Sequence, residues 1–295
     1  MYKKFNLSNL VTTKNMLEKA YKEKYAVAAF NVHNLEWSRA ALEVAQELNA
    51  PIILAVSKRG GEWFGSFASG VNLIVNLMKD LKITIPVAIH LDHGGSYEIC
   101  KDALEAGFTS IMFDGSANSI DRNINETKKV VELCHKYGVP VEAEVGTIGG
   151  EEDGVVGDVL YAKLDHCVRM KNEAHVDYIA AAVGSVHGHY KGKPKFGFDR
   201  MQKISEAIKI PMVLHGGSGI LDDQIKKAIS LGEAKINVNT ECQDHYCAAV
   251  KQYFVDKKDL LVHGYDSRKI QTAGMNAVKV AMREKILLFG SNNKA

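Results

Sequence analysis

The sequence contains no long hydrophobic run and no large excess of charge of one sign. It has 37 Lys and Arg against 35 Asp and Glu, a formal net charge of +2. Because no basic block stands out from this balance, we expect no nucleic-acid partner. No apolar stretch approaches the roughly 20 residues of a membrane helix, and the first residues lack the apolar core of a signal peptide. These absences predict a cytoplasmic protein that does not act at a membrane.

Cysteine is also sparse. The five cysteines are widely spaced and none forms a Cys-x-x-Cys pair, so we expect no disulfides and a reducing compartment. By contrast, 46% of the residues are apolar, which is ample material for a core. No linker or compositional break divides the 295 residues. We therefore expect a single domain that spans residues 1–295.

The most informative stretch is PVAIHLDHGG (86–95), in which an apolar run leads to Asp92 and His93 and then to two glycines. A short apolar run bounded by Pro and Gly is typical of a buried strand in a parallel sheet. Polar side chains at the end of such a strand are costly to bury unless they have partners. Asp92 and His93 therefore predict a functional site at this strand end.

Apolar strands alternate with amphipathic helices along the chain. Eight strands are predicted, at residues 25–31, 51–57, 86–93, 109–114, 140–146, 178–184, 211–215 and 234–239. Helices are predicted at 13–24, 35–48, 70–81, 97–106, 121–137, 163–172, from 199, at 222–230, from the last strand to about 256, and at 268–289, and the Gly-rich residues 146–157 are predicted to form a loop.

Such alternation implies a parallel sheet. Eight units favour an α/β fold of the (β/α)8 barrel (TIM barrel) type, with an extra helix at the N-terminus and a helical extension at the C-terminus. A doubly wound open sheet is the alternative. It would not explain why polar residues end so many of the strands.

Active sites of such barrels lie at the carboxyl ends of the strands. A polar residue alone at a strand end is often only structural, but here the predicted strand ends carry Asn31, Ser57, Asp92 with His93, Asp114, Glu144, Ser185 with His187, His215, and Asn237 with Asn239. The whole set predicts one shared site.

Three histidines in this set could meet around one metal ion. As neutral imidazoles, His93, His187 and His215 would form a three-ligand zinc site with one position open for substrate. Glu144 could be an additional ligand or could orient a histidine. His189 is close enough in sequence to compete with His187. Taken singly, each histidine is more often a hydrogen-bonded structural residue.

Two glycine-rich segments predict further parts of the site. HGGSG (215–219) exposes backbone N–H groups just before a helix, which favours a bound anion. In a barrel the end of the eighth strand lies beside it, and Lys191 could supply a counter-charge. GTIGGEEDG (146–154) places three acids between glycines and predicts a lid that delivers a general base.

A metal, an anion cradle and two carboxylates outside the metal shell suit enolate chemistry on a phosphorylated ketone. A metal-dependent barrel hydrolase is the rival enzyme hypothesis, and a non-catalytic sugar-phosphate-binding protein is the rival from another class. A Schiff-base mechanism is disfavoured because Lys235 falls at the wrong end of its strand.

Six motifs resemble those of the class II, metal-dependent fructose-bisphosphate aldolases, in the family's order and essentially from end to end. They are HLDH (90–93), VEAEVG (141–146), GGEED (149–153), GSVHG (184–188), LHGGSG (214–219) and KINVNT (235–240). The resemblance implies reversible retro-aldol cleavage of fructose 1,6-bisphosphate to dihydroxyacetone phosphate and glyceraldehyde 3-phosphate, in glycolysis or gluconeogenesis.

The same resemblance implies roles for the metal and catalytic residues. The three histidines would bind the catalytic zinc, with Glu144 nearby, and a second zinc site is also allowed. Asp92 would act as acid and base on the C4 hydroxyl, and Glu152 would move the proton at the dihydroxyacetone phosphate carbon. The ketose phosphate would rest beside a Na⁺ or K⁺ ion, on Gly188, Lys191, Gly216, Gly217, Ser218, Asn237, Val238, Asn239 and Thr240.

Other positions concern the remainder of the substrate and the assembly. Asn31 and Ser57 match positions that contact substrate. Arg268 matches an arginine that reaches the distal phosphate from a neighbouring subunit, which implies a homodimer or homotetramer, although Ser267 stands where the family usually has Pro. Tagatose-bisphosphate aldolases share nearly all the motifs and are the alternative. Residues 114–118 depart from the family pattern, which leaves the role of that loop open.

Overall fold

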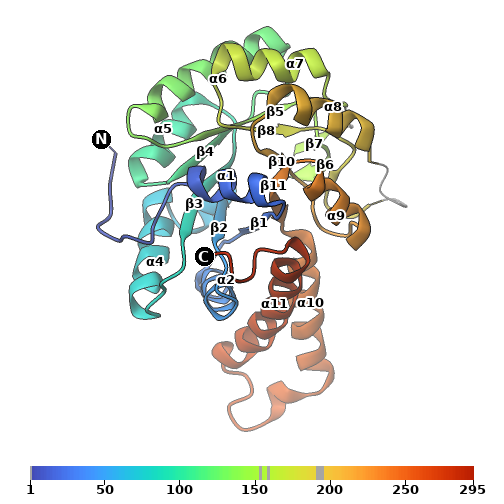
Figure 1. Ribbon diagram of the computed structural model, residues 1–295. Coiled ribbons are helices and arrows are strands. Elements are labelled where there is room, and N and C mark those ends of the chain that lie inside the picture. The colour runs from blue at the N-terminus through green and yellow to red at the C-terminus, as the bar shows by residue number, and fades with distance from the viewer. Residues whose placement is uncertain (1, 153–154, 158–159, 191–195) are drawn as a thin grey trace.

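The computed structural model describes residues 2–152, 155–157, 160–190 and 196–295. Eight parallel strands close into a barrel in which each strand pairs with the barrel strands before and after it in the chain (Figure 1). They are β1 (Val27–Asn31), β2 (Ile52–Ser57), β3 (Val87–Gly94), β4 (Ser110–Phe113), β5 (Val141–Val145), β8 (Tyr178–Ala181), β10 (Met212–Leu214) and β11 (Glu233–Val238). The predicted barrel is confirmed.

Helices surround the barrel, and several of them begin at a residue whose side chain caps the first turn. Asn34, Ser96 and Ser119, for example, each accept a hydrogen bond from a first-turn N–H group. The helices are α1 (Thr13–Glu23), α2 (Leu35–Glu47), α3 (Lys58–Trp63), α4 (Phe67–Asp80), α5 (Tyr97–Ala106), α6 (Ile120–His135), α7 (Leu164–Arg169), α8 (Phe198–Ile208), α9 (Asp222–Ser230), α10 (Thr240–Val255) and α11 (Ser267–Phe289), with a π turn at Met170–Ala174 and a 3₁₀ turn at Lys258–Leu260.

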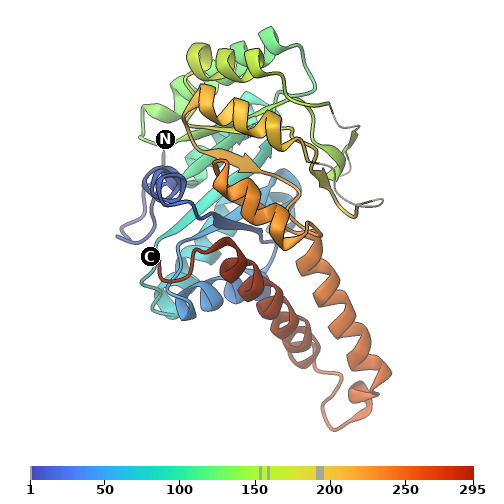
Figure 2. The same cartoon turned by 45° about the vertical axis from the view of Figure 1, so that its right-hand side comes forward.

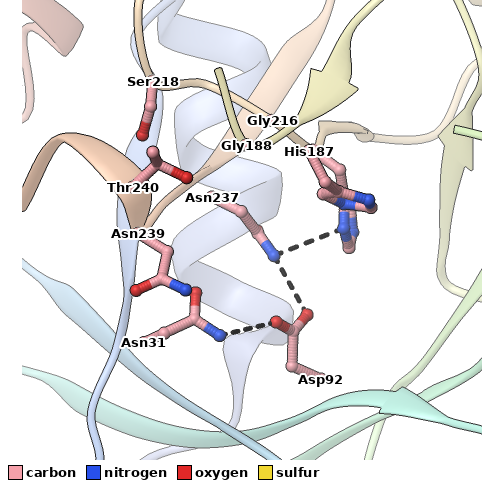
Figure 3. Close-up of a pocket in the computed structure, with 10 residues that line it drawn as sticks. Asn31, Asp92, His187, Gly188, Gly216, Ser218, Asn237, Asn239 and Thr240 are labelled. Carbon is pink, nitrogen blue, oxygen red and sulfur yellow. Dashed lines mark hydrogen bonds between the residues drawn. The ribbon is translucent and has the colours of Figure 1, made fainter. Parts of the chain in front are cut away.

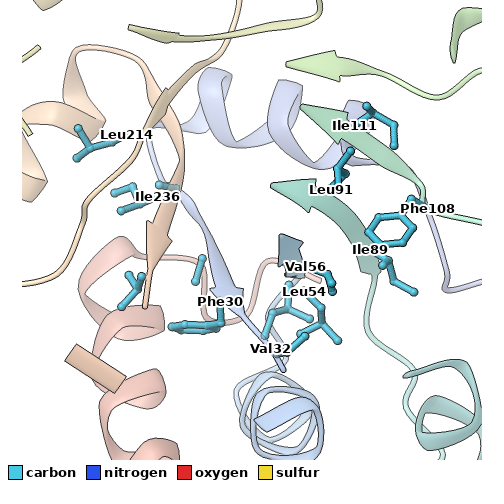
Figure 4. Packing of buried hydrophobic residues seen from close by; sticks show 14 of the residues in the cluster. Phe30, Val32, Leu54, Val56, Ile89, Leu91, Phe108, Ile111, Leu214 and Ile236 are labelled. Atoms are coloured by element: carbon cyan, nitrogen blue, oxygen red, sulfur yellow. The ribbon is translucent and has the colours of Figure 1, made fainter. Parts of the chain in front are cut away.

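Apolar residues lie on both faces of the barrel sheet. Because successive strand residues face opposite sides, Phe30, Leu54 and Ile89 pack outward against the helices (Figure 4). Their neighbours Ala29 and Ile53 face inward and join a second cluster with Met16, Leu17 and Ala20 of α1. Helix α1 therefore closes the amino end of the barrel, and the site is confined to the carboxyl end.

The prediction of a loop at 146–157 is wrong for part of that segment. β6 (Gly149–Glu152) and β7 (Val155–Gly157) form an antiparallel hairpin, and β6 also pairs in parallel with β9 (Val186–His187). Gly150 has φ of 95°, and a Cβ there would overlap the carbonyl of His187. A glycine-rich segment with no alternating pattern carries no local strand signal, so its strand partner is decided only by the fold.

Helix α3 was also not predicted. Its six residues include Gly60 and Gly61, and glycine disfavours a helix by about 1 kcal/mol per residue. Ser57 stabilises its start by accepting a hydrogen bond from the Gly60 N–H at 3.2 Å. The helix matters for function because it follows directly on a strand end at the mouth of the barrel.

Helices α10 and α11 pack against each other and project from the barrel as a hairpin (Figure 2). The tip of the hairpin exposes several large apolar side chains: Leu260, Leu261, Val262 and Tyr265. Among the helices of the described ranges, none is long and apolar enough to cross a membrane.

Glu233 is an acid enclosed in the floor of the barrel. It is 1% exposed, and neither carboxylate oxygen has a hydrogen-bond partner among the described residues. By strand alternation it shares the inward face of β11 with Lys235. Burial, with a smaller effect of the Glu142 charge, raises the pKa of Glu233 well above its ordinary value. The folded protein therefore favours the protonated form of this carboxyl.

We expect Glu233→Gln to stabilise the protein increasingly as pH rises. A raised folded-state pKa gives stability that is complete below the unfolded pKa, 4.5, and is lost as pH rises toward the folded pKa. The gain over wild type should grow by at most about 1.4 kcal/mol per pH unit. Urea denaturation of both proteins between pH 5 and pH 8 measures it. A pH-independent difference would show that Glu233 does not titrate on unfolding.

Candidate functional site

A cavity of about 290 Å³ lies at the carboxyl ends of the barrel strands (Figure 3). Every residue that lines it was named from the sequence. They are Asn31, Asp92, His187, Gly188, His215, Gly216, Ser218, Asn237, Asn239 and Thr240. Residues far apart in the sequence thus meet because each occupies the same end of its strand.

Three imidazole rings gather at one side of this cavity. The ring centroids of His93, His187 and His215 lie 4.7 to 5.8 Å apart, and one nitrogen of each lies within 4.8 Å of the others. His93 has φ of 49°, a left-handed conformation that is rare outside glycine and often marks a functional constraint. The predicted cluster of histidines is present.

Carboxylates stand behind two of the rings. Asp114 Oδ2 lies 2.9 Å from His93 Nδ1, and Glu142 Oε1 lies 2.8 Å from His215 Nε2. Because a carboxylate accepts, each ring donates from that nitrogen, and in the neutral form it keeps a lone pair on the other. The two remaining nitrogens, His93 Nε2 and His215 Nδ1, face each other at 3.0 Å. Two lone pairs at that distance require a cation or a proton between them.

Zinc fits this arrangement. Two nitrogen ligands of a tetrahedral zinc, with bonds of about 2.0–2.1 Å, lie about 3.3 Å apart, close to the separation seen here. Burial lowers the pKa of His187 and of His215, so both are neutral at pH 7, the form that a metal ligand requires. Burial acts the same way on His93, but its hydrogen bond to Asp114 and the charge of Asp92 raise its pKa well above the ordinary value.

Glu144 lies beside the histidines and could serve a second metal position. It is 2% exposed, and burial raises its pKa to about 8. Its Oε1 accepts from the Ile148 N–H at 3.1 Å, while Oε2 is buried without a hydrogen-bond partner in the described part of the chain. His93, Asp114 and Glu144 form a second group whose ligand atoms lie within 4.8 Å.

Asp92 faces the cavity with both oxygens held. Oδ2 accepts from Asn31 Nδ2 at 2.8 Å, and Oδ1 accepts from Asn237 Nδ2 at 3.0 Å (Figure 3). Although burial alone would raise the pKa of Asp92, the charge of the neighbouring His93, with a smaller effect of the buried Lys235, holds it well below the ordinary value. Asp92 is therefore an oriented carboxylate that can accept a proton, and Asn31 acts on it directly.

The opposite side of the cavity is a backbone cradle. Gly216 has φ of 64°, and a Cβ there would overlap the carbonyl of Val186. The Gly217 N–H donates to the Asn237 carbonyl at 2.9 Å, so Gly217 shapes the loop rather than offering its own donor. Thr240 begins the 16-residue helix α10. The start of this helix favours an anion in the cavity.

An ion pair ties this cradle to the C-terminal hairpin. Glu241 Oε2 accepts from the Gly219 N–H at 3.3 Å and from Lys285 Nζ at 2.7 Å. The Glu241 N–H donates to Ser218 Oγ at 3.1 Å. Helix α11, which carries Lys285, thereby braces the loop that forms the cradle.

A second space of about 780 Å³ opens beside the first. Asn31 and Asn239 border both. Ser57, Arg59 and Trp63 also line it, so helix α3 brings a guanidinium and an indole to the mouth. Ser57 thus lies at the edge of the site, as expected, while its hydroxyl caps α3.

Other residues named from the sequence lie elsewhere. His189 is exposed and its Nε2 lies 2.9 Å from Asp244 Oδ2, so it is not part of the histidine cluster. The side chain of Val238 is buried in the core. Arg268 is exposed at the start of α11. Its Nη2 lies 2.6 Å from Asp266 Oδ2.

Two further expectations concern the lid and the counter-charge. Glu152 is the last residue of β6, which pairs with the strand that carries His187. Lys191 lies outside the described residues.

Sequence reasoning missed three contributors. Glu142 alternates with Glu144 on β5, so two acids on one strand face were a signal of a polar barrel interior. Lys235 carries the same signal on β11, two residues before Asn237. Arg59 had no signal, because a lone arginine after a strand is usually solvated. Asp114 was named as a strand end, and its partner His93 now gives it a role.

The chain is similar to known proteins along almost its whole length. Residues 11–294 match the family described as "Fructose-bisphosphate aldolase class-II". Over 286 residues, 97% of this chain and 98% of the relative, it is 49% identical to the "6-phospho-5-dehydro-2-deoxy-D-gluconate aldolase" of Halalkalibacterium halodurans. Over 288 residues, 97% and 99% of the two chains, it is 48% identical to the "Fructose-bisphosphate aldolase" of Geobacillus stearothermophilus.

A solved structure of the YdjI aldolase from Escherichia coli matches with a TM-score of 0.83 and 34% sequence identity. The match covers 97% of this chain and 99% of that one. The family match over residues 11–294 includes the barrel, its helices and the C-terminal hairpin.

We expect Gly216→Ala to destabilise the protein by about 1–3 kcal/mol, since it combines a left-handed φ with overlap of the Val186 carbonyl. Gly188→Ala is the matched control, because Gly188 has φ of 80° but nothing within 4 Å of a Cβ. It should cost only the φ strain, about 1 kcal/mol. Urea denaturation compares the two, and equal losses would argue against a close approach at Gly216.

Proposed function

The chain belongs to the class II fructose-bisphosphate aldolase family and is a metal-dependent aldehyde-lyase, and we propose that it cleaves fructose 1,6-bisphosphate reversibly to dihydroxyacetone phosphate and glyceraldehyde 3-phosphate. One observation carries the proposal. A single cavity is lined by His215, the ionised Asp92 and the glycine cradle, and His93 approaches His215 to 3.0 Å. A cytoplasmic place in glycolysis or gluconeogenesis is part of the same proposal.

His93, His187 and His215 would hold the zinc ion, with Glu144 in reach as an extra ligand or as part of a second site. A bound zinc supplies an electrophile that polarises the substrate ketone and stabilises the negative charge that develops on its oxygen. Support comes from the 3.0 Å approach of His93 Nε2 to His215 Nδ1, which suits two ligands of one ion.

Asp92 would take the proton of the C4 hydroxyl as the C3–C4 bond breaks. The electron pair of that bond stays with the dihydroxyacetone phosphate half, and the C4 oxygen becomes the aldehyde. Support comes from the two amides that orient Asp92 and from its ionised form, since its pKa lies below the ordinary value. Glu152 would return a proton to the dihydroxyacetone phosphate carbon, and the pairing of β6 with β9 brings its strand beside His187.

The phosphate next to the ketone would occupy the backbone cradle. Gly188, Gly216, Gly217 and Ser218 would form one side, and the segment from Asn237 through Val238 and Asn239 to Thr240 the other, with Lys191 as a counter-charge. The start of helix α10 and the left-handed glycines support this placement. A Na⁺ or K⁺ ion beside the phosphate is proposed from the family resemblance alone.

A second candidate substrate is 6-phospho-5-dehydro-2-deoxy-D-gluconate, for which relatives of similar identity are named. As its name states, it carries a ketone and a phosphate near one end and a carboxylate at the other. Arg59 and Ser57 line the space beside the cavity, and a guanidinium can bind either a distal phosphate or a carboxylate. Tagatose 1,6-bisphosphate is the third candidate.

We propose that the enzyme is a homodimer or homotetramer in which Arg268 completes the distal site of a neighbouring subunit. Arg268 lies in the first turn of α11, on the α10–α11 hairpin, and its side chain is 89% exposed. The nearby tip carries exposed Leu261 and Val262, and such apolar surface is typical of an interface.

Chelation should abolish aldol cleavage, and added Zn²⁺ should restore it. We expect kcat/KM to be highest for fructose 1,6-bisphosphate when the three candidate substrates are compared in a coupled dihydroxyacetone phosphate assay. Activity that survives chelation would rule out the metal mechanism. Zinc-dependent cleavage of only one of the other two substrates would support the metal mechanism and show that fructose 1,6-bisphosphate is not the substrate.

Asp92→Ala should lower kcat by at least about 100-fold, the usual contribution of a general base, while zinc content stays near wild type. Loss of zinc instead would make Asp92 a ligand.

Mixing Asp92→Ala with Arg268→Ala after reversible dissociation should recover activity, because some mixed sites combine an intact Asp92 with an intact partner arginine. No recovery in verified mixed oligomers would exclude a shared site.

A further inference from the structure

An ion pair is buried inside the barrel directly below the histidines. Lys235 Nζ lies 2.7 Å from Glu142 Oε2, and both side chains are 0% exposed. Taking two charges out of water costs several kcal/mol per ion, and a well-packed apolar pair is often equally stable or more so. Stability therefore does not explain why this pair is buried.

Glu142 links the lysine to a histidine of the candidate metal site. Its Oε2 accepts from Lys235, and its Oε1 accepts from His215 Nε2 at 2.8 Å. A carboxylate paired with an ammonium is acceptor-only, so His215 must donate from Nε2. A neutral imidazole has one N–H, and Nδ1 is left as an acceptor. That nitrogen faces His93 Nε2 at 3.0 Å.

The direction of every bond around Lys235 is also determined. Lysine has only donors, so His90 Nε2, 3.0 Å away, accepts from it. His90 then donates from Nδ1 to Ser110 Oγ at 2.8 Å, and Thr13 Oγ1 of helix α1 lies 3.0 Å from the same hydroxyl. Lys235 is thus held by residues toward the closed end of the barrel. Because Lys235 can only donate, Glu142 accepts from it, and His215 in turn donates to Glu142.

We propose that Glu142 and Lys235 are positioning residues that set the tautomer of His215, so that Nδ1 is presented to the metal. The proposal rests on the proposed function in taking His215 as a zinc ligand. His93 is held in the opposite sense, because Asp114 accepts from its Nδ1 and leaves Nε2 for the metal. The two histidines thereby contribute different ring nitrogens to one point.

Glu142→Gln tests this directly, because the amide has one acceptor and one donor end. With Lys235 still charged, the amide oxygen should turn to the ammonium and the NH₂ group should face His215 Nε2. His215 would then carry its proton on Nδ1, where it blocks the metal. We expect zinc affinity, measured by chelator competition, to fall by about 10–100-fold, the usual effect of losing such a partner.

Adding Lys235→Met should rescue the zinc affinity of Glu142→Gln, because the amide oxygen is then released to accept from His215. A merely structural role predicts the reverse, a double variant worse than the single one. Glu233→Gln is the matched control, since it makes the same change to another buried barrel glutamate, and it should leave zinc affinity unchanged.

A second readout does not depend on zinc. Two-bond ¹H–¹⁵N spectra of chelated, ¹⁵N-histidine-labelled protein, assigned with a His215→Gln variant, report which nitrogen carries the proton. Wild type should show Nε2–H, and Glu142→Gln should show Nδ1–H. An Nδ1–H signal for His215 in wild type overturns the proposal, and this holds even if Glu142→Gln fails to fold. Zinc affinity that is unchanged in Glu142→Gln, with no effect of adding Lys235→Met, overturns it as well. Undiminished zinc affinity in His187→Ala would instead contradict the proposed metal site and leave the tautomer result standing.

Discussion

The site depends on the approach of two imidazole nitrogens, His93 Nε2 and His215 Nδ1, to 3.0 Å. Asp114 and Glu142 accept from the far side of each ring, so both near nitrogens present lone pairs to the same point. Such an arrangement is favourable only with positive charge at that point. The same positive charge favours an ionised Asp92, which two amides already hold toward the cavity.

The barrel interior has two parts, one toward helix α1 and one toward the mouth that supports the histidines. Toward helix α1 it is filled mainly by apolar side chains such as Ile53 and Met112, although Glu233 is buried there as a neutral acid. Toward the mouth it carries Lys235 and Glu142, fully buried and paired. Paired charges in the core are a poor source of stability. The apolar layer between the sheet and the surrounding helices supplies stability instead (Figure 4).

Under the proposed function, the two spaces at the mouth would divide substrate recognition into a common part and a variable part. The substrates named for two relatives share a ketone and a phosphate at one end. The glycine cradle and the start of helix α10 suit that end. The two substrates differ at the other end. Arg59 and Ser57 line the space that adjoins the cavity. Selection between a second phosphate and a carboxylate is therefore expected there rather than at the metal.

The sequence by itself determined the barrel, the strand ends that carry His93 and His215, and all ten residues of the cavity. Apolar runs that end in polar residues are local signals, and parallel strands bring those ends to one place. Only the tertiary structure decided that β6 pairs with β9, and that Glu142 rather than Glu144 stands behind His215. The last pair lies 73 residues apart. A hydrogen bond between them depends on the register of several strands to within a fraction of an ångström, and no local pattern encodes that.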